Sequence, residues 1–151
     1  MSRLFRAALY GGLVAGTVDI GAACLINGVG PALILRFIAS GLVGRANVLG
    51  RGAQILLLGL ILQWAMSILI AGIYAFAAER RAVLTRRWIA MGLSYGVVVF
   101  VVMTYVVVPL SAAPKSTHAS VRALALNFVA MLVFGLIVSG ITRSVYARGR
   151  S

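Results

Sequence analysis

The sequence predicts an all-α membrane protein: four transmembrane helices in a bundle, with a short amphipathic helix between the first two spans. Of its 151 residues, 62% are hydrophobic and 11% are charged, and the mean hydropathy is +1.07. A soluble domain carries about 25% charged residues. Four apolar runs are each long enough to cross a hydrocarbon core of about 30 Å, and basic residues gather at their ends. We therefore expect residues 1–151 to form one helical membrane domain.

The first span is expected at about residues 4–26. Its basic start resembles a signal peptide, but the apolar run is long, contains Asp19 and lacks a convincing small-residue cleavage pattern. We therefore expect the segment to be retained as a helix. Gly28 suits the end of that helix, because glycine adopts the left-handed conformation readily. Pro31 suits the first position of the next one, where its missing N–H leaves no bond unmade.

The short helix is expected at about residues 31–43. Apolar residues such as Leu33 and Phe37 recur there at helical spacing, whereas Arg36 and Ser40 fall on another side. At 1.5 Å per residue such a helix covers about 20 Å, which is too short to span a membrane. It should lie in the membrane interface or enter the membrane as a re-entrant element.

The other three spans are expected at about residues 53–78, 88–110 and 123–141. The second is free of charged residues, and the third is rich in valine. Valine favours strands in soluble proteins. In lipid, however, only helices and closed barrels satisfy the backbone hydrogen bonds, and this run does not alternate as a barrel strand would. We therefore expect a helix there too.

The distribution of basic residues predicts the orientation. If both termini and the loop 79–87 share one side, that side holds nine of the 14 lysines and arginines. The nine are Arg3, Arg6, Arg80, Arg81, Arg86, Arg87, Arg143, Arg148 and Arg150. The positive-inside rule then places both termini in the cytoplasm, and we expect a multi-pass protein of the bacterial inner membrane.

Polar residues within the spans form the candidate site. Asp19 stands out, because a carboxylate in lipid costs several kcal/mol unless it is neutral, paired or hydrated. Gln63, Ser67 and Asn127 lie on the second and fourth spans, and we expect all four side chains to face the bundle interior. Two interpretations stay open. The polar groups hold the helices in register through hydrogen bonds of about 0.6 kcal/mol each, or Asp19 titrates in a proton or solute path that the others line.

Glycines at four-residue spacing predict where the helices approach closely. Gly12 and Gly16 share the face of Asp19 in the first span, Gly92 and Gly96 repeat the spacing in the third, and Gly135 lies in the fourth. Small residues let helix backbones come together. We expect these faces to turn inward, and a glycine stripe left outside the bundle to meet a partner.

Other chemistry is not indicated. A single cysteine, Cys24, and a single histidine, His118, exclude an intrachain disulfide, a CxxC motif and bis-histidine haem ligation. We expect no cofactor, no metal site and no catalytic set. The basic residues flank apolar runs and do not suggest nucleic-acid binding. The predicted contacts of Arg36, Arg45 and Arg51 are anionic lipid head groups.

Four segments resemble a family of uncharacterised bacterial four-span inner-membrane proteins. They are GTVDI at 16–20, ILRFIASGLVGRA at 34–46, LGLILQW at 58–64 and YGVVVFVVMTYVVVPLSAAP at 95–114. The resemblance covers about half of the chain and implies a four-helix membrane fold, without an activity. In that family a histidine often stands where Gln63 stands here, followed by an aromatic residue such as Trp64. The glutamine weakens any proposal of metal or haem binding at this position.

The expected function is that of a small accessory or interaction subunit, which contacts a protein partner or another copy of itself through helix packing. The alternative is a small dimeric proton- or cation-coupled transporter that uses Asp19. A lipid-modifying enzyme, with Arg36, Arg45 and Arg51 holding phosphate, is the least favoured class, because no acid/base pair is present. We therefore do not expect an enzyme.

Overall fold

The computed structural model describes residues 1–48, 52–112 and 120–148, and every regular element within them is helical. Four helices are long and apolar enough to cross a membrane, and a shorter apolar helix lies between the first two. These helices are α1 (Arg3–Asn27), α2 (Pro31–Val43), α3 (Ala53–Arg80), the span Trp88–Leu110 and α7 (Val121–Ala147). The predicted fold class is confirmed, and the chain is a multi-pass membrane protein.

The third span is not a uniform α-helix. Its parts are α5 (Trp88–Val102), the π-helical turn η2 (Met103–Val107) and α6 (Val108–Leu110). Within η2 the N–H of Val108 bonds to the carbonyl of Met103, five residues back. Pro109 follows directly; it has no N–H, and its ring would clash with a carbonyl in the preceding turn of a regular helix. The wider π turn accommodates the proline without ending the span.

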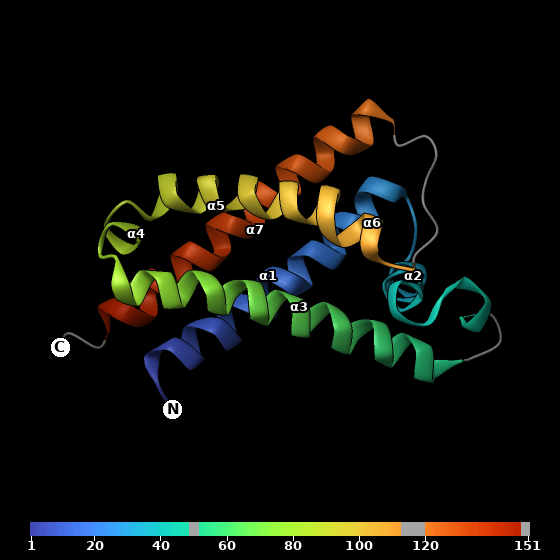
Figure 1. Cartoon of the computed structure of the whole chain (residues 1–151), viewed down its shortest axis with the longest axis horizontal. Helices are drawn as coiled ribbons and strands as arrows, with labels where there is room; N and C mark the ends of the chain where they lie inside the picture. Colours follow the sequence, from blue (N-terminus) through green and yellow to red (C-terminus); the bar gives the residue numbers. More distant parts are fainter. Residues whose placement is uncertain (49–51, 113–119, 149–151) are drawn as a thin grey trace.

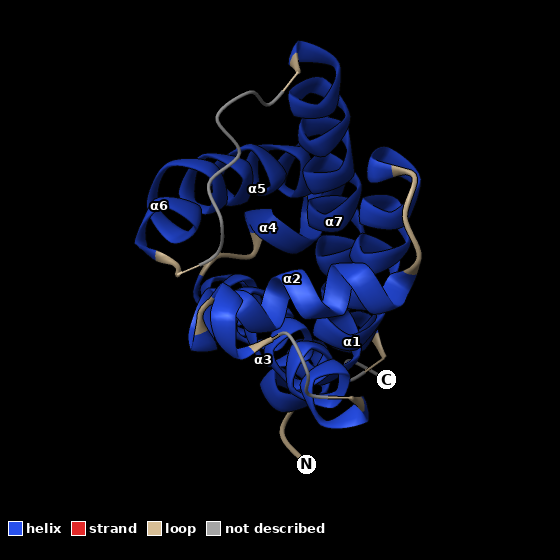
Figure 2. Cartoon of the chain, turned by 90° about the vertical axis from the view of Figure 1, so that its right-hand side faces the viewer, coloured by secondary structure: helices blue, strands red, loops and turns tan. Residues whose placement is uncertain are grey.

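Helix α2 lies across one end of the bundle. Figure 1 shows it nearly end-on beside the long helices, and Figure 2 shows it along its length. The predicted boundary is confirmed: Gly28 caps α1 with a φ of 65°, and Pro31 is the first residue of α2. The amide of Ala112, just after the third span, donates to the carbonyl of Gly41 at 2.9 Å. This bond ties α2 to the end of that span.

The two ends of the bundle differ in the segments they hold. Both chain termini lie at the end that also carries the short helix α4 (Val83–Arg86) (Figure 1). We call this the terminal end, at Arg3 and Ala147, and the opposite one the α2 end, at Asn27 and Ala53. The half of each span nearer the terminal end is called the terminal half, and the half nearer the α2 end is called the α2 half.

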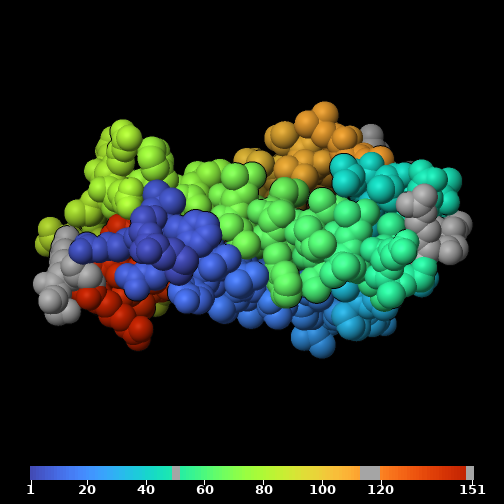
Figure 3. Space-filling view, turned by 90° about the horizontal axis from the view of Figure 1, so that it is seen from below, coloured from blue at the N-terminus to red at the C-terminus, as the bar shows by residue number. Residues whose placement is uncertain are grey.

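The spans pack in the order α3, α1, α7, α5. Helix α1 contacts both α3 and α7, and α5 packs against α7; Figure 3 shows α1 and α3 side by side along the molecule. Helices α3 and α5 do not pack along their lengths, which leaves one side of the bundle open. Within each span's apolar window only 11–22% of residues are buried, so most apolar side chains face outward, as lipid requires.

Candidate functional site

A hydrogen-bonded pair, Asp19 and Gln63, joins α1 to α3 inside the apolar layer. The side-chain amide of Gln63 donates to Oδ2 of Asp19 at 2.8 Å, and it also lies 3.5 Å from the carbonyl of Gly16. Asp19 is half-buried and lies eight residues before the end of α1, which is about 12 Å at 1.5 Å per residue. The carboxyl therefore lies well inside the α2 half.

A second bond between the same helices lies beside this pair. The indole N–H of Trp64 points to the hydroxyl of Thr17 at 3.3 Å, and that hydroxyl donates to the carbonyl of Leu13 at 2.7 Å. Close approach of the helices makes these bonds possible, since a Cβ on Gly16 would come within 2.5 Å of the hydroxyl of Ser67. The glycine thus brings α3 near enough for Gln63 to reach Asp19.

Asp19 also lines a groove between α1 and α7, here called the α1/α7 groove. Its volume is about 310 Å³. It is lined by Ala15, Val18, Asp19, Ala22, Leu25 and Ile26 of α1 and by Leu126, Val129, Ala130, Val133 and Phe134 of α7. Asp19 is the single ionisable side chain in this lining. The carboxyl thus has an amide on one side and an open apolar groove on the other.

Gln63 lines a different hollow, the α2/α3 groove, with a volume of about 640 Å³. Side chains of α2, α3, η2 and α6 surround it, among them Phe37, Met66 and Met103. The two grooves are therefore separated at this depth by one polar pair, with Asp19 exposed to the first and Gln63 to the second.

The other predicted polar residues do not join the pair. Ser67 is buried one turn along α3, where it faces Gly16 and not the carboxyl. Asn127 is exposed, contrary to the expectation that it faces the bundle interior. It shares a helix face with the buried Phe134, one heptad later, but it lies in the first turns of α7, which project away from the other spans (Figure 1). In the part of the chain that the structure describes, that face is exposed near the helix start.

The predicted packing glycines all lie at contacts within the chain. A Cβ on Gly12 would overlap the backbone of Ile68 in α3. Added Cβ atoms on Gly92, Gly96 and Gly135 would overlap atoms across the α5–α7 contact. These five glycines are thus used for helix contacts within the chain. None of them is left on the outside of the bundle for the expected contact with a partner.

The predicted head-group arginines lie apart from this site. Arg36 in α2 and Arg45 in the short helix η1 (Arg45–Asn47) are exposed at the α2 end. Arg51 and the sole histidine, His118, lie outside the described residues. Within the described ranges, Asp19 pairs with an amide and not with an arginine.

Three tyrosines that were not predicted as site residues join neighbouring segments in the terminal half through hydrogen bonds. Their hydroxyls donate to backbone carbonyls: Tyr95 to Ile70 at 2.6 Å, Tyr74 to Leu84 at 3.1 Å and Tyr146 to Ala75 at 3.2 Å. Tyr95 thereby bridges the open side between α5 and α3. A phenol within an apolar run is the signal that identifies such residues, because a buried hydroxyl needs a partner.

No protein-family model, curated protein or solved structure compared with the chain matches it. The resemblance to uncharacterised four-span proteins therefore stays a prediction. Among the described residues, no three of the His, Cys, Asp and Glu side chains gather in a group that could hold a metal ion. Function is accordingly inferred from the Asp19–Gln63 pair and its two grooves.

Proposed function

We propose that the protein is an interaction subunit of a bacterial inner-membrane complex, with both termini in the cytoplasm, and that a transmembrane helix of a protein partner occupies the α1/α7 groove. The observation that carries the proposal is the position of Asp19. Its carboxyl receives one hydrogen bond from Gln63 and otherwise faces an open groove of apolar side chains.

The chemistry of the groove defines the partner. A carboxyl in lipid costs several kcal/mol unless it is neutral or paired, so a partner group that covers it stabilises the assembly. The fitting partner is a helix with a lysine or arginine, or a neutral hydrogen-bond donor, at the depth of Asp19. Small side chains at Ala22 and Ala130 let such a helix approach closely.

Native mass spectrometry of the tagged protein, extracted in mild detergent from its own membrane, tests this proposal. The wild type should carry a fixed additional subunit mass, and Asp19→Leu should release it. Asn127→Leu is the matched control, because Asn127 is also a polar residue of a span but does not line the groove. It should retain the partner. A wild-type protein that appears only as a bare monomer or homodimer contradicts the proposal.

A second candidate, a proton- or cation-coupled transporter, is favoured by one specific observation. Asp19 and Gln63 are bonded to each other while each lines a different groove. A titrating carboxyl at that junction can exchange a proton or a cation between the two grooves. Proteoliposomes of the purified protein should then show a pH-driven flux that Asp19→Asn abolishes and Asn127→Leu preserves. Equal flux in wild type and Asp19→Asn excludes this candidate.

A further inference from the structure

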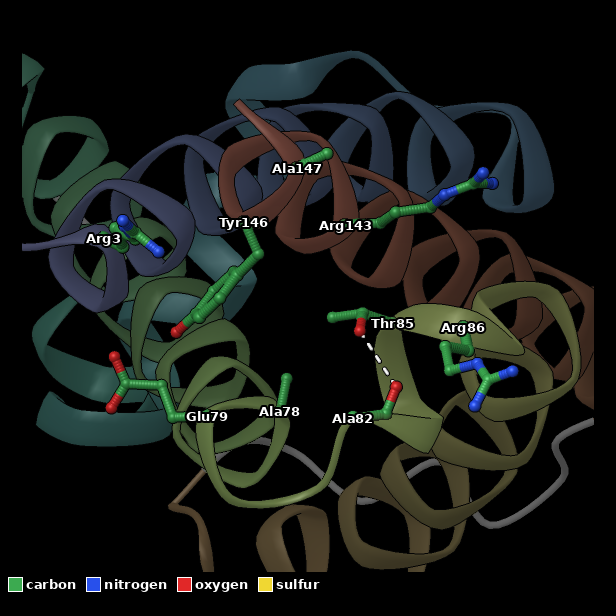
Figure 4. Close-up of a pocket in the computed structure, with 9 residues that line it drawn as sticks. All are labelled: Arg3, Ala78, Glu79, Ala82, Thr85, Arg86, Arg143, Tyr146 and Ala147. Atoms are coloured by element: carbon green, nitrogen blue, oxygen red, sulfur yellow. Dashed lines mark hydrogen bonds between the residues drawn. The ribbon is translucent and has the colours of Figure 1, made fainter. Parts of the chain in front are cut away.

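We propose that a hollow at the terminal end binds the phosphate group of an anionic lipid head group. This terminal pocket has a volume of about 580 Å³ and lies where the start of α1, the end of α3, α4 and the end of α7 meet (Figure 4). It is at the opposite end from the predicted head-group arginines Arg36 and Arg45. It is also separate from Asp19, so the interaction-subunit proposal can fail without affecting it.

Small side chains open the pocket. Ala78 at the end of α3, Ala82 in the following turn and Ala147 at the end of α7 line it. Three alanines from separate segments leave space where larger side chains would close the contact between α7 and α4. The space lies at the ends of two spans, which is the depth of the lipid head groups.

The charges around the pocket favour an anion. Its lining holds Arg3, Arg86 and Arg143 against a single acid, Glu79. Figure 4 places Arg86 and Arg143 on one side and Arg3 and Glu79 on the other. The lining therefore holds three guanidinium groups against one carboxylate, and Arg86 and Arg143 lie on the side away from that carboxylate. Guanidinium groups match phosphate oxygens with paired, charge-assisted hydrogen bonds.

The neighbouring hydroxyls are already engaged, so the guanidinium groups are the donors for the phosphate. The hydroxyl of Thr85 donates to the carbonyl of Ala82 at 3.0 Å, which fixes the turn before Arg86. The hydroxyl of Tyr146 donates to the carbonyl of Ala75. Arg143 lies over the ring of Trp88, with 5.6 Å between its Cζ atom and the ring centroid. A cation–π contact of this kind restricts the arginine before a ligand arrives.

The experiment compares two double variants that remove the same charge. Arg86→Gln/Arg143→Gln alters the terminal pocket, and Arg81→Gln/Arg87→Gln removes two exposed arginines at the same end that do not line the pocket. Each protein is reconstituted with phosphatidylcholine and phosphatidylglycerol, and retained phosphatidylglycerol is measured by native mass spectrometry. The pocket variant should retain at least about tenfold less, because it loses the charge-assisted hydrogen bonds of both guanidinium groups. The control should match the wild type.

Titration with inorganic phosphate in lipid-free detergent separates the two sources of a phosphate group. Phosphatidylglycerol should raise the unfolding temperature of the wild type, and inorganic phosphate should not. Stabilisation by inorganic phosphate alone overturns the lipid assignment. Equal lipid loss in both double variants also overturns it, since that result indicates unspecific charge attraction.

A single variant, Arg143→Lys, keeps the test decisive if the pocket variant does not fold. It preserves the charge and the fold but loses the paired donor geometry. We expect several-fold lower retention of phosphatidylglycerol than in the wild type. Retention equal to the wild type contradicts the proposed paired contact.

Discussion

The terminal half and the α2 half of the same four spans differ in how openly they are packed. In the terminal half, Ala71, Tyr74 and Val138 are buried in one cluster, and tyrosine hydroxyls bond to backbone carbonyls of neighbouring segments. In the α2 half, the spans diverge around two grooves, and the bonds of Gln63 and Trp64 to α1 cross between helices. The terminal half is closed at the glycine contact between α5 and α7, whereas the α2 half is open on either side of the Asp19–Gln63 pair.

This contrast has a physical basis. Lipid tails are as apolar as leucine, so helices in a membrane associate through close packing and hydrogen bonds instead of the hydrophobic effect. Glycine and alanine supply the close packing in the terminal half. In the α2 half, Gly16 and Gly59 bring α3 close to α1 and α2, a polar pair joins α1 to α3, and two grooves stay open beside that pair.

Among the variants compared here, the largest effect is expected at Gly96, in the terminal half. A Cβ on Gly96 would lie 2.5 Å from the carbonyl oxygen of Met131 and 2.8 Å from the Cα of Leu132, which are backbone atoms that cannot rotate away. Gly96→Ala should lower the free energy of unfolding by about 3 kcal/mol, the upper part of the usual range for overpacking. Unfolding in mixed detergent micelles measures it.

Gly21→Ala is the matched control, because an added Cβ at Gly21 meets nothing within 4 Å. Alanine is the better helix former by up to about 1 kcal/mol, so this variant should be as stable as the wild type or more stable. Equal losses in the two variants would contradict the close contact between α5 and α7 at Gly96.

The next effect tests the polar pair by a double-mutant cycle. Gln63→Leu removes the donor to Asp19 and should cost about 1–3 kcal/mol, whereas Asp19→Leu leaves Gln63 its contact with Gly16 and should cost less. The double variant should lose about 1 kcal/mol less than the two single losses together. Strictly additive losses would mean that the pair does not couple α1 to α3.

A smaller effect is expected at Tyr95, whose hydroxyl bridges the open side to Ile70 at 2.6 Å. Tyr95→Phe keeps the ring and removes the bond, so the free energy of unfolding should fall by about 1 kcal/mol. Tyr105→Phe is the control, since Tyr105 is 68% exposed in η2. A greater loss at Tyr105 than at Tyr95 would contradict the assignment of the bridge.

The smallest effect on stability is expected at Pro109. Pro109→Ala restores an N–H, so η2 should become regular helix, and amide hydrogen exchange in residues 103–112 should slow. The free energy of unfolding should change by less than about 1 kcal/mol. In Pro31→Ala, at the first position of α2, exchange should stay the same, because the N–H there has no helical partner. If amide hydrogen exchange is unchanged in Pro109→Ala, the proline is not the cause of the π turn.

The features predicted from the sequence are those set by local rules. Length and apolar composition place the spans, and Gly28 with Pro31 places the turn before α2. The fourth span extends to Ala147, six residues beyond the expected end, because an arginine such as Arg143 ends an apolar run without ending a helix.

The features that were missed depend on how helices cross. Asn127 is exposed because α7 starts beyond its neighbours, which its own sequence does not encode. The two grooves and the tyrosine bridges likewise follow from the angles and lengths of several helices at once. Asp19 and Gln63 stand out in the sequence as polar residues in lipid. Their bond to each other, and the separate grooves that they line, depend on how α1, α3 and α7 cross.

The position of Gln63, the hydrogen-bond donor to Asp19, affects how the protein can insert into the membrane. Gln63 belongs to α3, the next span to be synthesised, whereas the far wall of the α1/α7 groove belongs to the last one. Spans enter the bilayer as helices before they pack together. The nascent carboxyl can therefore be paired as soon as the first helical hairpin forms, and it does not wait in lipid for the end of translation.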